Sequence, residues 1–167
     1  QAVAAALKPF GVRNPAYLFL SSAIGAWASA DFQDTAAIVK EYDVTDSVAV
    51  PGMYAVTFQY TTGWNGLHIS RAALVSSPKG KPTERVEFSV DEHEGVTGCT
   101  STGNLYRLRL NRVDPGSTYR VVVTMRGVRP QDQHAGKTGC GGTVLFQCER
   151  EPDWQARVMN VKPLPEM

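Results

Sequence analysis

The chain has 167 residues, of which 43% are hydrophobic and 20% are charged, and these proportions are ordinary for a globular protein. Its 17 Lys and Arg residues nearly balance 16 Asp and Glu residues, so the net charge of +1 draws it neither to nucleic acid nor to an anionic membrane. No apolar run approaches the roughly 20 residues that span a bilayer, and the length predicts one domain with or without tails.

The two ends of the chain differ in composition from its centre. Residues 1–23 begin with an Ala-rich helical pattern that Pro9 and Gly11 stop, and we expect a lead-in from a preceding domain or an edge strand. A β-sandwich domain is expected over residues 24–150. The proline-containing residues 151–167 predict a last edge strand and a tail. Because the chain begins with Gln rather than Met, we expect a domain cut from a longer protein or a processed chain.

The clearest pattern lies in residues 51–75, PGMYAVTFQYTTGWNGLHISRAALV. Apolar residues alternate with polar ones before and after the turn TTGWNG, which is the period of a half-buried strand. After the turn the pattern places Leu67 and Ile69 inward and continues with Ala73 and Val75. Two such strands joined by a short turn with glycine predict a hairpin.

Further strands are expected at the spacing of a β-sandwich. The predicted strands lie at 36–43, 52–61, 66–76, 84–91, 104–111, 118–127 and 142–148. In the fourth strand we expect Val86, Phe88 and Val90 to point inward. Residues 16–20 could form an edge strand, whereas SSAIGAWASADFQD, from residue 21, has the composition of a loop. Short alternating strands with polar outer faces predict an all-β fold, an antiparallel β-sandwich.

If successive strands run antiparallel, every second connection lies at the same end of the sandwich. The loops after the second, fourth and sixth predicted strands, and the segment that enters the first, would then share one end. That end would collect Trp27, Trp64, Asn65, His93, Glu94, Cys99, Asp132, His134 and Cys140. Long polar loops on a rigid scaffold are where binding sites usually lie. The alternative is that each Trp closes one end of the core.

Motifs for catalysis are absent from the sequence. We find no G-x-S-x-G, H-E-x-x-H, S-x-x-K or phosphate-binding glycine loop. The acidic run DEHEG at residues 91–95 invites a metal or an acid–base interpretation, but consecutive strand residues point to opposite faces, which favours a polar strand end. We therefore predict no catalytic residue, no cofactor and no metal ligand, and leave a structural calcium open as an unsupported alternative.

Three cysteines fit no zinc-binding spacing. Cys99 and Cys140 each end a Thr-Gly-Cys turn, and the alternation of connections places both turns at one end. We predict that they form a disulfide and that Cys148 stays a buried thiol. Such a bridge would indicate an oxidising compartment. The alternative is that all three are small buried hydrophobic residues.

The order of the motifs resembles a known family. YDVTDSV, PGMYAVTFQYTTG, LHISRAALV, DEHEGVTG, NLYRLRL, GSTYRVVVTMRG and GTVLF follow one another as in the C-terminal β-sandwich of secreted bacterial glycoside hydrolases similar to β-N-acetylhexosaminidases. The resemblance covers residues 24–147 and is most specific in the DVT-to-PGMY run and the HEG-x-TG loop. It implies a jelly-roll fold of the galactose-binding type. The chain departs from the family pattern at the Trp64–Asn65 turn and at the two cysteine turns.

From the resemblance and the residues together we expect a non-catalytic accessory domain of a secreted carbohydrate-active protein, located outside the cytoplasm in the periplasm, in the medium or at the cell surface. Its partners would be a weakly bound glycan and a covalently linked catalytic domain. The candidate glycan-binding residues are Trp64, Asn65, Trp27, His93, Glu94 and His134. One alternative is a purely structural or protein-interaction sandwich that braces a catalytic domain, and a second is an enzyme in its own right.

Overall fold

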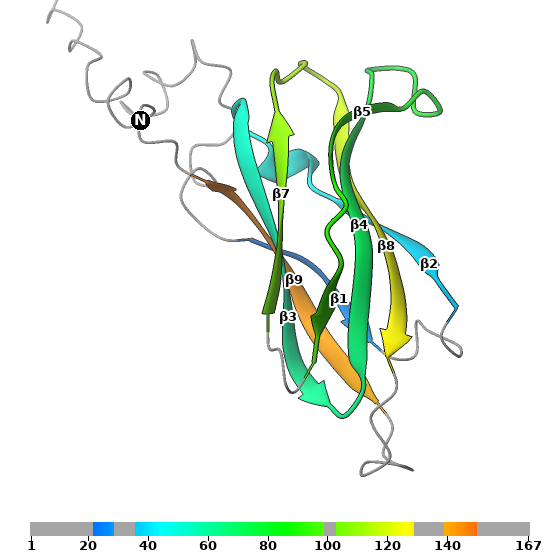
Figure 1. Cartoon of the computed structure of the whole chain (residues 1–167). Helices are drawn as coiled ribbons and strands as arrows, with labels where there is room; N and C mark the ends of the chain where they lie inside the picture. The colour runs from blue at the N-terminus through cyan, green and yellow to red at the C-terminus, as the bar shows by residue number, and fades with distance from the viewer. Residues whose placement is uncertain (1–21, 29–35, 99–102, 129–138, 150–167) are drawn as a thin grey trace, which may run out of the picture.

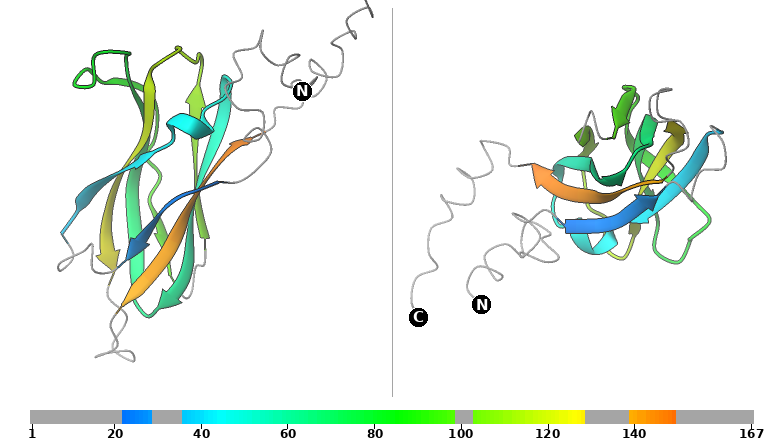
Figure 2. Two further views of the ribbon diagram at one scale, coloured as in Figure 1. Left: turned by 180° about the vertical axis from the view of Figure 1, so that it is seen from behind. Right: turned by 90° about the horizontal axis from the view of Figure 1, so that it is seen from below.

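The computed structural model describes residues 22–28, 36–98, 103–128 and 139–149, which form two β-sheets packed face to face (Figures 1 and 2). Its elements, in chain order, are β1 (Ser22–Ala28), β2 (Ile38–Asp43), the 3-10 helix η4 (Thr45–Ser47), β3 (Gly52–Gly63), β4 (Gly66–Ser77), β5 (Val86–Asp91), β6 (Gly95–Thr97), β7 (Gly103–Leu110), β8 (Thr118–Val128) and β9 (Cys140–Glu149). Within these ranges no helix is long and apolar enough to cross a membrane.

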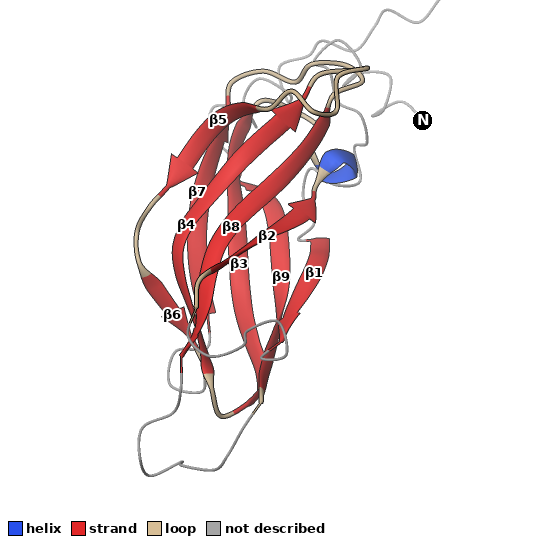
Figure 3. Ribbon diagram, turned by 90° about the vertical axis from the view of Figure 1, so that its right-hand side faces the viewer, coloured by secondary structure: helices blue, strands red, loops and turns tan. Residues whose placement is uncertain are grey.

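The strand order is that of a jelly roll. One sheet has the order β1-β9-β3-β7, and the other has the order β2-β8-β4-β5, with β6 also paired to β4 (Figure 3). Each strand of the first half pairs antiparallel with its counterpart from the second half: β1 with β9, β2 with β8, β3 with β7, and β4 with β5 and β6. This is one long hairpin rolled into two sheets. The predicted all-β antiparallel sandwich of jelly-roll type is confirmed.

The seven predicted strands are present, with ends that differ by up to two residues, and the structure adds β1 and β6. The prediction of a loop around Trp27 was wrong, because β1 is built mostly from Ala, Gly and Ser and shows little apolar alternation. Its Gly25 allows Tyr42 to approach, since a Cβ there would stand 2.6 Å from the ring. β1 begins at Ser22, two residues before the expected domain boundary. The edge strand expected at 16–20 and the one expected within 151–167 lie outside the described residues.

The predicted hairpin of β3 and β4 is wrong, because the two strands belong to different sheets. β3 pairs with β7 and β9, whereas β4 pairs with β5, β6 and β8. The apolar faces of the two strands therefore oppose each other across the core. Alternation and a short turn are common to hairpins and to turns between sheets, so the sequence pattern alone could not separate the two.

A bulge in β4 changes which of its residues face the core. Its register with β8 shifts between Ile69 and Arg71, so one extra residue turns the rest of the strand over. Leu67 and Ile69 are buried in the core as predicted, but after the bulge the core residues are Ala72 and Leu74. The predicted inward positions of Ala73 and Val75 were therefore wrong.

The outer face of the larger sheet is covered by charged side chains. Arg85 precedes β5 at one edge of the sheet and forms an ion pair with Glu41 on β2 at the opposite edge. Arg120 on β8 also contacts Glu41, at 3.8 Å. These charged side chains lie over the outer face of the sheet, which carries the buried Ala73 and Val75. Val86, expected to point inward, is 43% exposed because it begins an edge strand.

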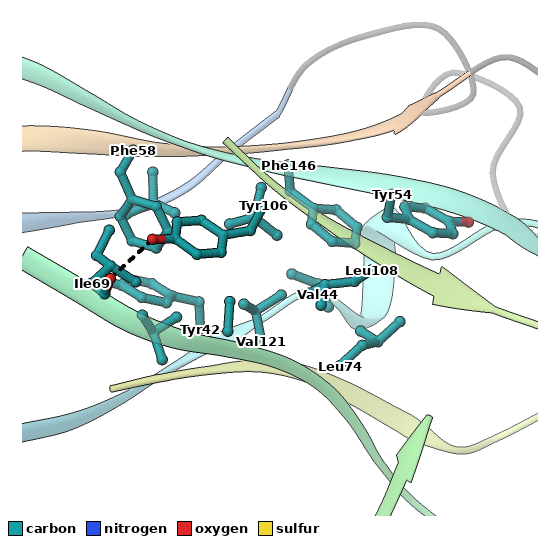
Figure 4. Close-up of a cluster of buried hydrophobic side chains, with 14 of the residues drawn as sticks. Tyr42, Val44, Tyr54, Phe58, Ile69, Leu74, Tyr106, Leu108, Val121 and Phe146 are labelled. Atoms are coloured by element: carbon teal, nitrogen blue, oxygen red, sulfur yellow. Dashed lines mark hydrogen bonds between the residues drawn. The ribbon is translucent and has the colours of Figure 1, made fainter. Parts of the chain in front are cut away.

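The core between the sheets is rich in aromatic rings (Figure 4). Tyr54 stacks on Phe146 with ring centroids 4.9 Å apart, and Phe58 meets Tyr106 edge-on at 6.0 Å. These rings come from the smaller sheet, and Leu74 and Ile69 of the larger sheet belong to the same buried cluster. Burial of each such side chain contributes about 1.5–3 kcal/mol, so the sandwich is held mainly by this layer.

Three of the strand ends that the alternation argument placed together do lie at one end of the sandwich. Trp27 pairs with Gly142, Gly63 with Cys140, and Gly66 with Val128. The chain leaving β1, β3 and β8 therefore lies at one end, which we call the turn end. The Trp64–Asn65 turn is its described connection.

Replacing Gly63 with Ala should destabilise the turn end. Gly63 has φ +98°, and a Cβ there would stand 2.1 Å from the Gly139 carbonyl oxygen and 2.4 Å from the Cys140 Cα. Because both obstacles are backbone atoms, we expect a loss of at least about 2 kcal/mol in the free energy of unfolding, measured by urea denaturation.

Gly103→Ala is the matched control, since a Cβ at Gly103 meets nothing within 4 Å. Its unfolding free energy should change by no more than about 0.5 kcal/mol. Equal effects of the two substitutions would contradict the described packing of the turn.

Candidate functional site

The Trp64–Asn65 turn is fixed to the neighbouring strand by its backbone. The Gly139 carbonyl accepts hydrogen bonds from the amides of Trp64, at 2.7 Å, and Asn65, at 3.3 Å. The Tyr60 hydroxyl donates to the Gly63 carbonyl just before the turn. Trp64 is nevertheless 41% exposed as a residue. The turn therefore presents a large aromatic side chain to solvent from a backbone that is held in place.

Glycines bring β6 close to this turn. A Cβ on Gly66 would stand 3.2 Å from the Thr97 carbonyl oxygen and 3.5 Å from a methyl group of Val96. A Cβ on Gly98 would stand 3.3 Å from the Gly66 Cα and 3.6 Å from the Asn65 carbonyl oxygen. Val96 is itself 42% exposed. Two exposed apolar side chains, Trp64 and Val96, thus come from segments that pack against each other.

Trp27 does not belong to an exposed platform. Its side chain is 2% exposed and is part of the core cluster. The indole lies over Gly142, where a Cβ would stand only 2.4 Å from its Nε1. The prediction that Trp27 helps to form a sugar-binding surface is therefore wrong, and the alternative that it closes the end of the core holds.

Unpartnered buried polar atoms gather at the turn end. Within the described ranges, they are Trp27 Nε1, Asn65 Oδ1 and Thr97 Oγ1. All three residues lie at or beside the strand ends that define the turn end. Buried polar atoms without partners are costly, so they are uncommon in folded proteins. The unmet hydrogen-bonding capacity of the described structure is therefore concentrated at this end.

His93 lies away from the turn end. The linker 92–94 between β5 and β6 runs along the edge of the larger sheet, beside the middle of β4 (Figure 3). His93 Nδ1 lies 2.7 Å from Asp91 Oδ1, and His93 Nε2 lies 3.3 Å from Asn104 Oδ1. Both ring nitrogens are thus engaged within the protein. Alternation of connections could not show this, because β6 splits the predicted loop.

Glu94 has a highly exposed side chain, and its carboxylate lies 3.6 Å from His68 Nε2. It belongs to the same linker, and the next residue, Gly95, pairs with Ile69 of β4 rather than with the turn. His134 lies outside the described residues. The structure therefore places Trp64 and Asn65 together at the turn end and does not bring His93 or Glu94 to them.

Only one of the two cysteines of the predicted disulfide lies in the described part of the chain. Cys140 is buried at the start of β9 and pairs in register with Gly63, whereas Cys99 lies outside the described residues. Cys148 is half-buried and packs against the core. The bridge between Cys99 and Cys140 stays a prediction. In the described part of the chain, no group of three or more His, Cys, Asp or Glu side chains is arranged to hold a metal ion.

A hydrogen-bonded network around Tyr106 was not anticipated from the sequence. Asn104 Nδ2 donates to the Tyr106 hydroxyl at 3.0 Å. That hydroxyl in turn donates to the Ile69 carbonyl at 3.1 Å (Figure 4). Burial raises the pKa of Tyr106 to about 12. The only sequence signal was a polar Asn at an otherwise inward position of β7.

Comparisons with known proteins assign this chain to no family. A scan against protein-family models and a search of curated proteins found no match. Among solved structures, the chain is similar to TmCBM61, a carbohydrate-binding module in complex with β-1,4-galactotriose. The two are 20% identical, the match covers 77% of this chain and 67% of that chain, and the TM-score is 0.29. The fold assignment rests on the strand order of the chain itself.

Truncation of the two described tryptophans should lower the free energy of unfolding by very different amounts. Trp27→Ala removes a buried indole, and we expect it to lower the free energy of unfolding by about 3–5 kcal/mol. Trp64→Ala removes a side chain that is 41% exposed, and we expect a change below about 1 kcal/mol. Denaturant unfolding of both variants checks this. A large loss with Trp64→Ala would show that this residue also supports the core.

Proposed function

We propose that this chain is a non-catalytic glycan-binding domain, and that it binds sugar weakly at the turn end through Trp64. The observation that carries the proposal is the exposed indole on a turn whose amides are tied to Gly139. The apolar face of a pyranose ring packs well on an aromatic side chain. A fixed turn also lowers the ordering cost of binding, because the aromatic ring is already in position.

Polar groups for sugar hydroxyls are available beside the indole. Asn65 follows Trp64 directly and is half-buried, with its amide oxygen buried and unpartnered, so a sugar hydroxyl reaches that oxygen only if the side chain turns outward. Since Trp27 and His93 are engaged within the fold, the surface is smaller than the sequence predicted. One stacked ring and a few hydrogen bonds of about 1 kcal/mol each indicate a dissociation constant on the order of millimolar, or about 4 kcal/mol. A tethered partner domain would compensate through effective concentration.

The biological setting is part of the proposal. The resemblance of residues 24–147 supports a place beside the catalytic domain of a secreted bacterial glycoside hydrolase similar to β-N-acetylhexosaminidases. The chain would then work in the periplasm, in the medium or at the cell surface, and would itself hydrolyse no glycoside.

A second candidate function is suggested by the outer face of the smaller sheet. Ala23, Leu145, Thr57 and Leu105 lie in one row across its four strands. The row is uncharged, and its side chains are half-buried or exposed. An uncharged row of this kind could pack against a neighbouring domain, with Arg107 and Glu149 of the same face at its border, which favours the alternative of a bracing sandwich.

Glycan binding should depend on the Trp64 ring. We expect native protein to be retarded in affinity gels that contain galactose, N-acetylglucosamine or N-acetylgalactosamine polymers, and Trp64→Ala to lose that retardation. Trp64→Tyr, which keeps an aromatic face, should retain part of it. Equal mobility of all three proteins in every gel would contradict the glycan proposal and favour the bracing function.

The compartment can be tested through the thiols. If Cys99 and Cys140 are bridged, titration of the unfolded, unreduced protein should find one reactive thiol, that of Cys148. A bridge of this kind stabilises by roughly 2–4 kcal/mol, so reduction should also lower the melting temperature. Three reactive thiols would contradict both the bridge and the argument for an oxidising compartment.

A further inference from the structure

The open edge between the two sheets is closed by side chains rather than by a strand. β7 is an edge strand of the smaller sheet, and β5 is an edge strand of the larger one. The Arg107 amide donates to Asp91 Oδ2 at 3.0 Å, and the Arg109 amide donates to Ser89 Oγ at 2.9 Å. Two β5 side chains thus satisfy amides on the exposed side of β7. We call this edge the seam.

His93 extends the seam toward β6. Its ring stacks on Tyr106 with centroids 4.0 Å apart and an interplanar angle of 13°. Asn104 sits close against the linker, because a Cβ on Gly95 would stand 1.8 Å from its Nδ2. The linker residue His93 and the β7 residues Asn104 and Tyr106 therefore form one packed contact across the seam.

The hydrogen bonds around His93 have a fixed direction. The Ile69 carbonyl can only accept, so the Tyr106 hydroxyl donates to it and accepts from Asn104 Nδ2. This orients Asn104 with its carbonyl oxygen toward His93 Nε2, and Asp91 presents a carboxylate oxygen to Nδ1. Both ring nitrogens face acceptors. A neutral imidazole can donate only once, so the arrangement requires the imidazolium form.

Asp91 is the charged group that contacts the His93 ring directly, because the other charged side chains nearby face other partners. Glu92 of the linker turns to Arg71 on β4, at 3.6 Å, and Glu94 turns to His68 on β4, at 3.6 Å. Arg107 on β7 pairs with Glu149 on β9, at 3.0 Å. Arg71 and Arg107 are thus matched with carboxylates, and Asp91 contacts the His93 imidazole itself.

Apart from the contacts of His93, residues 92–97 are held chiefly by β4, through the contacts of Glu92 and Glu94 and through β6. Linker 92–94 lies between two strands, and β6 has three residues that pair with β4 alone. Segments with few buried contacts are the first to open locally. The contact of His93 with β7 therefore decides whether residues 92–97 stay packed across the seam.

We propose that protonated His93 is a pH-operated clasp that holds residues 92–97 across the seam, closed in mildly acid solution and released in alkaline solution. On losing its proton, the ring can no longer donate to Asp91 and Asn104 together. One of the two hydrogen bonds then breaks, and the charge attraction to Asp91 disappears.

The pKa shifts give the direction of the effect. Burial opposes the charge on His93, but its hydrogen bonds to Asp91 and Asn104 outweigh burial and raise the pKa of His93. Burial also opposes the charge on Asp91, but hydrogen bonds from Arg107 and His93 outweigh it and lower the pKa of Asp91. The clasp is therefore complete between about pH 4 and pH 6.5, is lost as pH rises through the folded pKa of His93, and is lost as pH falls through that of Asp91.

NMR titration combined with hydrogen exchange tests the clasp. We expect the His93 ring signals, assigned by their absence in His93→Gln, to titrate above pH 6.5. Across the same range the amides of residues 93–97 should lose at least fivefold in protection, after correction for the intrinsic exchange rate. The amide of Val56, in the centre of β3, should keep its protection.

Two carboxylate variants separate the clasp from general charge effects. Asp91→Asn should move the His93 titration and the loss of protection to lower pH together. Glu92→Gln removes a neighbouring carboxylate that faces Arg71 instead and should move neither. The proposal is overturned if His93 titrates at or below pH 6.5, if protection of residues 93–97 does not follow its titration, or if both variants shift it equally.

Discussion

A single hydroxyl group joins the two sheets at the position where the larger sheet changes its register. Tyr106 belongs to β7 in the smaller sheet, and its hydroxyl donates to the Ile69 carbonyl of β4 in the larger sheet. Ile69 is the last residue before the β4 bulge. The ring of Tyr106 packs edge-on against Phe58 in the core and is covered by His93 on its other side. Core packing, the β4 register and the seam therefore all meet at Tyr106.

This arrangement separates two parts of the molecule with different roles. At the turn end the chain is fixed by backbone contacts of Gly63 and Gly139, which leave the Trp64 indole exposed. Along the seam, residues 92–97 depend on side-chain contacts that include an ionisable ring. The proposed binding surface thus lies on fixed backbone, and the proposed pH-sensitive contact lies on a short segment whose other contacts are chiefly with β4. β6 connects the two, because Val96 and Thr97 pack against Gly66 beside the turn.

The sequence predicted the strands well, because successive side chains of a strand point alternately to the buried inner face and to the outer face of the sheet. This alternation is visible in the sequence as apolar and polar residues in turn. It also predicted that β1, β3 and β8 end at the same end of the sandwich, since antiparallel order is sufficient for that argument, but it wrongly placed residues 92–94 there. It could not show that β3 and β4 lie in different sheets, because both arrangements bury the same alternating residues. The extra residue at the β4 bulge likewise leaves no local pattern, so Ala73 and Val75 were assigned to the wrong face.

The candidate site was predicted less well, for reasons specific to each residue. Trp64 and Asn65 were placed correctly because a two-residue turn between long strands has only one position. Trp27 looked exposed because β1 is rich in small residues, and its burial depends on Gly142, more than a hundred residues later in the chain. His93 looked like part of a loop at the turn end because three-residue β6 was not recognised. Its partners on β7 are brought near only by the jelly-roll topology.

Mapping of amide and indole chemical shifts during sugar titration tests the central claim most directly. With isotopically labelled protein and galactose, N-acetylglucosamine or N-acetylgalactosamine at concentrations up to about 50 mM, the account predicts saturable shifts that centre on the Trp64 indole and on residues 62–66 and 139–141. Saturable shifts centred instead on the Thr57 and Leu145 row of the smaller sheet, or no shift with any of the three sugars, would contradict it.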